Sequence, residues 1–214
     1  MIFLHRQNKF NDSKNFYDNV DGVEVDVRSS INGLVLDHDR LHHNLNHYPL
    51  FDEEIEKFCL IRKSIIFNIK ESGVEEEIID RMKDKDIEWY FLDSQIPDIL
   101  RLSKQYPEIS HKFIIRVSDV ETMNEEFVRK IQPSFIWLDF SSFDNYSSDE
   151  YVYLLFDTIE QVNTMCQKTN IILVSPELYS LDYIDIAKYI SNIFRKEFNS
   201  ISVCTKFPEL YRKS

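Results

Sequence analysis

A chain of 214 residues can bury a full core as one domain and lies at the compact end of the range for an eight-stranded α/β barrel. Its formal charge of -12 argues against a nucleic-acid groove, which needs clustered Lys and Arg, and against stable attachment to anionic membranes. An anionic ligand that approaches so acidic a protein must be met by a local cation, either a bound metal ion or a basic side chain.

Strand-like runs rich in Ile, Val, Phe, Trp and Tyr recur along the chain with helical patterns between them, which is typical of repeated βα units. Apolar spacing and acidic start signals predict helices over 52–58, 74–83 and 148–166. Eight runs are predicted as strands: 2–5, 22–28, 64–70, 87–93, 112–118, 134–140, 170–176 and 200–206. This alternation predicts an α/β fold, a single compact (β/α)8 barrel that spans residues 1–214 as one domain.

The second predicted strand carries an unusual set of charges. Glu24, Asp26 and Arg28 alternate with valines, so the valines are expected to face the helices and the charged groups the barrel interior. Charges inside a barrel are costly to desolvate, which favours a functional site. An interior ion pair between an acid and Arg28 or Lys70 remains the structural alternative.

Short motifs around this strand carry further acid–base groups. Ile2-Phe-Leu is followed by His5-Arg6, and Leu34-Val-Leu leads into Asp37-His38-Asp39. Together with Glu24-Val-Asp26-Val, these motifs resemble the glycerophosphodiester phosphodiesterase family, whose hallmarks are a His-Arg pair, a Glu-x-Asp-Val strand and a downstream His-Asp. The resemblance is strongest over residues 1 to 70, roughly a third of the chain.

Two weaker similarities follow, together with several differences. Asn68-Ile-Lys70 lies where the family has Glu-x-Lys, and Thr205-Lys206-Phe-Pro208 resembles its closing Thr-Asp-x-Pro. Asn68 therefore replaces a Glu, Gln7 replaces the Gly after His-Arg, and Lys206 replaces an Asp. The usual Glu-Asn-Thr segment is missing, because residues 7–21 allow only a loop and a short helix.

The resemblance implies a divalent cation held by Glu24, Asp26 and the side-chain carbonyl of Asn68. Hard oxygen ligands of this kind suit Mg²⁺ or Ca²⁺. Because Asn68 lacks the charge of a Glu, we expect weaker binding, with more of the coordination left to water or substrate oxygens.

The same resemblance implies roles for two histidines and for basic side chains. Imidazole titrates near neutral pH, so His5 and His38 can serve as general base and general acid. Arg6 and Lys70 would hold the non-bridging phosphate oxygens. Arg116 shares inward parity with Ile114, which makes it the best further candidate for binding the substrate phosphate. A structural ion pair is an equally open alternative for Arg116. Other charged groups near predicted strand ends are Asp93, Asp139, Glu177 and Lys206.

The predicted function is hydrolysis of a small soluble phosphodiester, such as a glycerophosphodiester or a related polyol or sugar phosphodiester, to a phosphomonoester and an alcohol. The rival from another class is a catalytically silent barrel that binds an anionic ligand or a partner protein, motivated by Asn68 and the other departures. A phospholipase D-type lyase ranks lower, because that activity would need an apolar membrane-docking surface and export.

Cysteines and the N-terminus bear on the compartment. Cys59, Cys166 and Cys204 are far apart with no Cys-x-x-Cys, which favours reduced thiols. A strand that begins at Ile2 leaves no room for a signal peptide, and no apolar run approaches membrane-spanning length. We therefore predict a cytoplasmic protein. The polar stretch 39–51 is expected to lie over the barrel rim as a substrate-facing loop, with a disordered surface excursion as the alternative.

Overall fold

The computed structural model describes the chain apart from residues 43–47, 141–146, 166–168, 181–182, 198–200 and 213–214. Cys166, the middle of the 39–51 stretch and one end of each predicted element at 148–166 and 200–206 lie outside the described residues. Of the described cysteines, Cys59 and Cys204 are free thiols. On either side of the undescribed part of the 39–51 stretch, the His42 backbone N–H donates to Tyr48 Oη at 2.7 Å.

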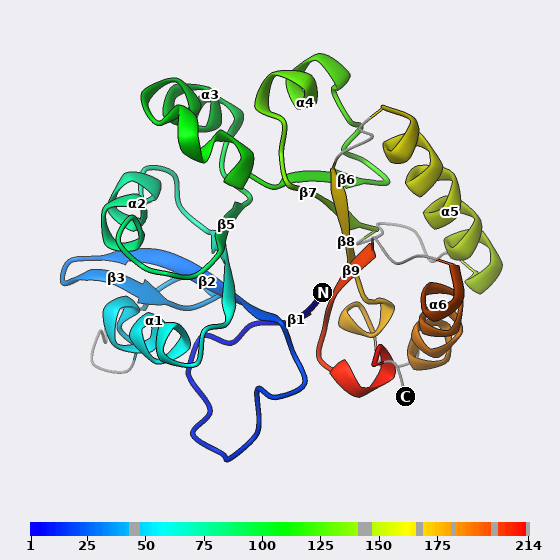
Figure 1. The fold of residues 1–214 in the computed structure, drawn as a ribbon, viewed down its shortest axis with the longest axis horizontal. Coiled ribbons are helices and arrows are strands. Elements are labelled where there is room, and N and C mark those ends of the chain that lie inside the picture. Colours follow the sequence, from blue (N-terminus) through cyan, green and yellow to red (C-terminus); the bar gives the residue numbers. More distant parts are fainter. Residues whose placement is uncertain (43–47, 141–146, 166–168, 181–182, 198–200, 213–214) are drawn as a thin grey trace.

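Eight parallel strands form a nearly closed barrel, as the sequence predicts (Figure 1). They are β1 (Ile2–Leu4), β2 (Gly22–Ser30), β4 (Ser64–Ile69), β5 (Trp89–Leu92), β6 (Ile115–Ser118), β7 (Phe135–Asp139), β8 (Asn170–Val174) and β9 (Ile201–Thr205). Hydrogen bonding follows the order β5-β4-β2-β1-β9-β8-β7-β6. A bridge between Phe91 and Phe113, with Ile114 N–H donating to the Phe91 carbonyl at 2.8 Å, joins the two ends of this order.

Helices surround the strands on the outside of the barrel (Figure 1). The α-helices are α1 (Phe51–Leu60), α2 (Glu75–Met82), α3 (Ile96–Gln105), α4 (Glu125–Ile131), α5 (Ser148–Met165) and α6 (Ile184–Glu197). The short 3-10 helices are η2 (Pro107–Lys112), which lies between α3 and β6, η3 (Pro176–Leu178), which follows β8, and η5 (Pro208–Leu210), which follows β9. In the described part of the chain, no helix combines the length and apolar character that a membrane crossing requires.

Two features depart from strict alternation of strand and helix. The stretch 7–21, predicted as a loop with a short helix, contains turns and bends but no helix, and it projects from the barrel as a coil (Figure 1). Its Asn and Ser residues bond locally, for example Ser13 N–H to Asn11 Oδ1 at 2.9 Å, which competes with helix formation. A ninth strand, β3 (Gly33–Leu36), pairs antiparallel with the far end of β2.

The barrel has an outer and an inner layer of side chains. Val23, Val25 and Val27 are fully buried in the core between strands and helices, as predicted from their parity. Residues of the opposite parity point into the barrel, where a separate apolar cluster includes Phe3, Ile66, Ile114 and Ile172. These four come from alternate strands, which is how a barrel of this type fills its interior.

The pairing register places the next interior layers. Each layer takes one side chain from every second strand. From one of these strands to the next, the residue in the layer lies about two positions further along the chain than the residue that the hydrogen-bonded register pairs with it. Above the apolar layer, toward the C-terminal ends of the strands, this assignment gives first Glu24, Leu92, Trp137 and Cys204, and then His5, Asn68, Arg116 and Val174. Polar groups thus begin where the apolar interior ends.

Candidate functional site

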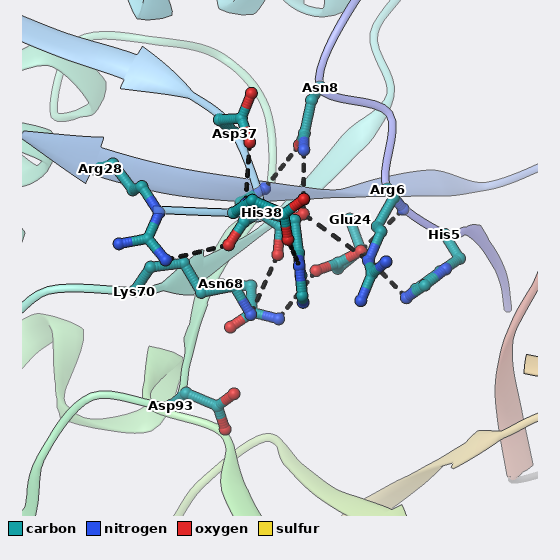
Figure 2. A network of polar contacts seen from close by, with 12 residues as sticks. His5, Arg6, Asn8, Glu24, Arg28, Asp37, His38, Asn68, Lys70 and Asp93 are labelled. Carbon is teal, nitrogen blue, oxygen red and sulfur yellow. Dashed lines mark hydrogen bonds and ion pairs between the residues drawn. The ribbon is translucent and has the colours of Figure 1, made fainter. Parts of the chain in front are cut away.

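Glu24 and Asp26 form the centre of a polar network at the C-terminal mouth of the barrel. Figure 2 shows Glu24 with the side chains around it. Both side chains come from β2 and neither has solvent exposure. Their inward parity confirms the expectation from the alternating sequence. Two carboxylates buried side by side are stable only if other groups compensate their charge.

The turn after β1 wraps around Glu24. Arg6 donates its backbone N–H to Glu24 Oε2 at 2.7 Å, and Gln7 donates its backbone N–H to the Glu24 carbonyl at 2.7 Å. Arg6 adopts a φ of 50°, which non-glycine residues rarely do. This backbone conformation aims the amide at the carboxylate, and it places His5 Nε2 3.9 Å from Glu24 Oε2.

Asp26 is held from two sides. Lys70, just beyond β4, brings Nζ to 3.0 Å from Asp26 Oδ1. Asn8 donates from Nδ2 to Asp26 Oδ2 at 2.9 Å and accepts the Asp26 backbone N–H at 2.7 Å, while Arg6 Nε lies 4.0 Å from Oδ2. The interior ion pair foreseen as the structural alternative is therefore present, between Asp26 and Lys70.

Asn68 lies beside Glu24, as the pairing of β2 with β4 requires. Its Nδ2 donates to Glu24 Oε1 at 2.9 Å. Its Oδ1 is buried and has no hydrogen-bond partner among the residues that the structure describes. The amide thus stabilises the Glu24 carboxylate by a hydrogen bond and leaves a free acceptor inside the mouth of the barrel.

His38 reaches the same rim through β3. Asp37 donates its backbone N–H to the Asp26 carbonyl at 3.1 Å, which fixes the end of β3 next to the acidic pair. The His38 carbonyl accepts a hydrogen bond from Arg28 at 2.9 Å, and His38 Nδ1 lies 2.9 Å from Asp39 Oδ1. Arg28 itself points to the rim, where it pairs with Glu71 at 3.0 Å.

Burial shifts the proton equilibria of two of these groups. Burial, with the neighbouring Asp26 carboxylate, raises the pKa of Glu24 to about 7. Burial, with the cations of Arg6 and Lys206, lowers the pKa of His5 to about 4. At neutral pH the His5 imidazole is therefore uncharged and able to accept a proton.

Arg116 occupies the same interior layer as His5 and Asn68 but has its own partners. Its guanidinium binds Asp93 through two nitrogens at 2.9 and 2.5 Å, and Asp139 Oδ2 through a third at 2.6 Å. Burial alone would lower the pKa of Arg116, but Asp93 and Asp139 raise it. The structure thus gives Arg116 the ion pair that the sequence left open beside a phosphate-binding role.

The remaining charged groups near strand ends serve partly to join strands. Glu177 is buried and accepts hydrogen bonds from the hydroxyls of Ser175 and Thr205 and from the Lys206 backbone N–H, so it links the ends of β8 and β9. Asp139 also accepts from Tyr179 Oη at 2.8 Å. These contacts hold together the rim at the ends of β7, β8 and β9.

The oxygen donors expected for a metal ion lie together, although they are few. Glu24, Asp26 and Asn68 are neighbours in register on β2 and β4. Asn68 presents Nδ2 to Glu24, so its Oδ1 would join the two carboxylates around a cation only after the amide rotates by half a turn. Among the described residues, no group of three or more His, Cys, Asp or Glu could hold a metal ion. The donors fit a hard cation, but with low ligand charge and with Lys70 competing for Asp26.

Sequence reasoning missed Asn8. Its side chain satisfies both the carboxylate and the backbone N–H of Asp26, so it positions the acid from the turn that replaces the missing segment. The only signal in the sequence is its place two residues after Arg6, in a loop rich in side chains that bond to nearby backbone.

Comparison with known proteins supports the fold. No protein-family model matches the chain, and no curated protein matches its sequence. The structure is similar to that of a phosphodiesterase from Oleispira antarctica in complex with the product sn-glycerol-3-phosphate, at 15% identity and a TM-score of 0.66 over 98% of this chain and 94% of that chain. It is also similar to a glycerophosphodiester phosphodiesterase from Parabacteroides distasonis, at 11% identity and a TM-score of 0.53 over 97% of this chain and 94% of that chain. At these identities the likeness establishes the barrel fold over nearly the whole chain.

Proposed function

We propose that this chain is a divergent glycerophosphodiester phosphodiesterase that hydrolyses a small soluble phosphodiester to a phosphomonoester and an alcohol. The observation that carries the proposal is the convergence of His5, Glu24, Asp26, Asn68 and Lys70 at the mouth of the barrel. The two similar structures are phosphodiesterases, which supports the same class of reaction.

The phosphate is anchored by the cations beside Asp26. The Arg6 side chain is 44% exposed, and its planar fork can take two non-bridging oxygens. Lys70 is 17% exposed and adds a point charge from the opposite side of Asp26. A bound phosphodiester competes with Asp26 for both cations, so the ion pairs of the free protein are exchanged for contacts with the substrate.

In the proposed hydrolysis, the two histidines transfer the protons. His5 is neutral at pH 7 because burial lowers its pKa to about 4, and it therefore takes the proton of the attacking oxygen, from water or from a neighbouring hydroxyl of the substrate. His38 is oriented by Asp39 through Nδ1, which leaves Nε2 to protonate the departing alcohol.

We also propose that Glu24, Asp26 and the Asn68 carbonyl hold a divalent cation, Mg²⁺ or Ca²⁺. When bound, such an ion neutralises the phosphodiester and polarises it for attack. The two buried carboxylates favour a cation here, since burial, together with the neighbouring Asp26 carboxylate, raises the pKa of Glu24.

One observation favours the rival, a silent barrel that binds an anion. Every carboxylate oxygen of Glu24 and Asp26 already has a donor or cation of this chain within 3.0 Å, so the acidic pair is compensated without a metal ion. In that case Arg6 and Lys70 hold an anionic ligand and no bond is broken.

Turnover separates the two functions. Purified protein is incubated with Mg²⁺ or Ca²⁺ and a panel of glycerophosphodiesters and sugar phosphodiesters, and phosphorus NMR follows conversion of diester to monoester. The proposal expects a monoester from at least one member of the panel. No turnover by protein that binds sn-glycerol 3-phosphate would favour the silent barrel.

A further inference from the structure

Three buried polar atoms without hydrogen-bond partners belong to the two adjacent interior layers beneath the rim. They are Trp137 Nε1, Asn68 Oδ1 and His5 Nδ1, and none has a hydrogen-bond partner among the described residues. A buried donor or acceptor that is left unpaired carries the full cost of its lost hydration. Three such atoms on β7, β4 and just beyond β1 indicate that a polar ligand or ordered water satisfies them.

Trp137 differs from the other two because the proposed chemistry gives it no role. It belongs to the layer of Glu24, Leu92 and Cys204, directly beneath the layer of His5 and Asn68. Its side chain is only 4% exposed and is part of the inner apolar cluster. Around the barrel, β7 lies on the opposite side from β2, so Trp137 comes from the wall across the interior from the acidic pair.

The chemistry of the Trp137 indole limits which chemical groups can bind to it. The Nε1–H group donates and cannot accept, so its partner must be an acceptor such as a phosphate oxygen or a hydroxyl. The ring also offers an apolar surface to the carbon skeleton of a small alcohol. A phosphodiester presents both kinds of group, whereas a water molecule would need further polar partners in a layer that is otherwise apolar apart from Glu24.

We propose that Trp137 is a substrate-contacting residue, whose indole N–H donates to an oxygen of the ligand and whose ring packs against its carbon atoms. The inference rests on the proposed function, because the ligand is the phosphodiester or its phosphomonoester product. Trp137 thereby sets which alcohols fit the mouth of the barrel.

The chain supplies a matched control. Its only other tryptophan, Trp89, is also 4% exposed but faces the helices, where the Lys112 Nζ lies 4.8 Å from its ring centroid. Trp89→Phe therefore leaves Trp137 as the only tryptophan, and Trp137→Phe leaves Trp89. Both changes keep an aromatic ring and remove one N–H donor.

Fluorescence and binding of sn-glycerol 3-phosphate test the inference. We expect the ligand to change the emission of the Trp89→Phe protein but not that of the Trp137→Phe protein. We also expect Trp137→Phe to bind roughly tenfold more weakly than Trp89→Phe, as for one lost hydrogen bond to a charged acceptor. Separate titrations with inorganic phosphate and with glycerol show whether the indole contacts a phosphate oxygen or a hydroxyl. Only the compound that carries the contacted oxygen should change the emission of the Trp89→Phe protein.

Indole N–H resonances of the wild-type protein provide a second measurement that does not depend on the folding of a variant. The ligand should shift the Trp137 resonance and slow its solvent exchange, and leave the Trp89 resonance in place. Unchanged affinity in Trp137→Phe, or a shift confined to Trp89, would overturn the inference while phosphodiester turnover by the wild type still stands. A wild type that neither binds these ligands nor hydrolyses the panel overturns the proposed function, and the inference with it.

Discussion

The buried acid Glu24 has an unusual proton equilibrium, which makes it the most sensitive single residue of the site. Its pKa is raised from 4.5 to about 7 by burial and by Asp26. Between these two values the folded protein keeps a proton that the unfolded chain releases, so the free energy of unfolding falls as pH rises through this window. Below 4.5 both states hold the proton and this loss is absent.

Replacing Glu24 by Gln removes this pH dependence, because the amide does not ionise. In buffer free of divalent ions, we expect the stability of Glu24→Gln relative to wild type to increase from pH 4.5 to above 7. Urea unfolding at a series of pH values measures it. Glu53→Gln, a change at an exposed position of α1, is the control and should follow the wild type. Parallel curves for wild type and Glu24→Gln would contradict the assigned pKa.

Asn68 decides how strongly the site holds a metal ion. Asn68→Glu adds a carboxylate beside Glu24 and Asp26 and should tighten Mg²⁺ or Ca²⁺ binding, whereas Asp26→Asn should weaken it, since ligand charge is a main control on affinity for hard cations. Calorimetric titration of the three proteins makes the comparison. If neither ion binds to any of them, the metal part of the proposal fails.

Individual strands were predictable from sequence because their apolar runs are short, rich in β-branched and aromatic residues and regularly spaced. The hairpin strand β3 is not among the eight predicted strands, although Asn32-Gly33 is a hairpin signal, because an antiparallel partner of β2 falls outside the strand–helix alternation that defines the eight. The contacts of Asn8 could not be predicted, since they depend on how the turn after β1 folds back across β2.

Gly22, the first residue of β2, has no room for a side chain. A Cβ there would lie 2.6 Å from Phe3 Cε1 and 2.6 Å from the Ser64 carbonyl, so neighbouring strands would have to move apart. We expect Gly22→Ala to reduce the free energy of unfolding by about 1–3 kcal/mol, as for other overpacked cores. Ser29→Ala, at an exposed position of the same strand, should change it little. Equal stability of both variants in urea unfolding would show that the strands adjust freely.

At the scale of the whole molecule, the barrel brings residues from distant parts of the chain to one mouth. Parity and register place His5, Glu24, Asn68 and Arg116 on the inside, and this much follows from the sequence once eight strands are recognised. The partners of Arg116 do not follow, because Asp93 and Asp139 come from neighbouring strand ends whose side-chain geometry the sequence does not specify. The formal charge of -12 likewise conceals the local cations Arg6 and Lys70 beside Asp26.

The proposed reaction depends most on the two histidines acting as an acid–base pair, and the turnover of His5→Ala and His38→Ala tests their role most directly. Each variant should lose on the order of a hundredfold or more in kcat on the best phosphodiester, with little change in thermal stability. His111→Ala, an exposed histidine on η2 that is distant from the mouth in the fold, should keep the wild-type rate. Near-normal turnover by either the His5 or the His38 variant would contradict the role assigned to that residue.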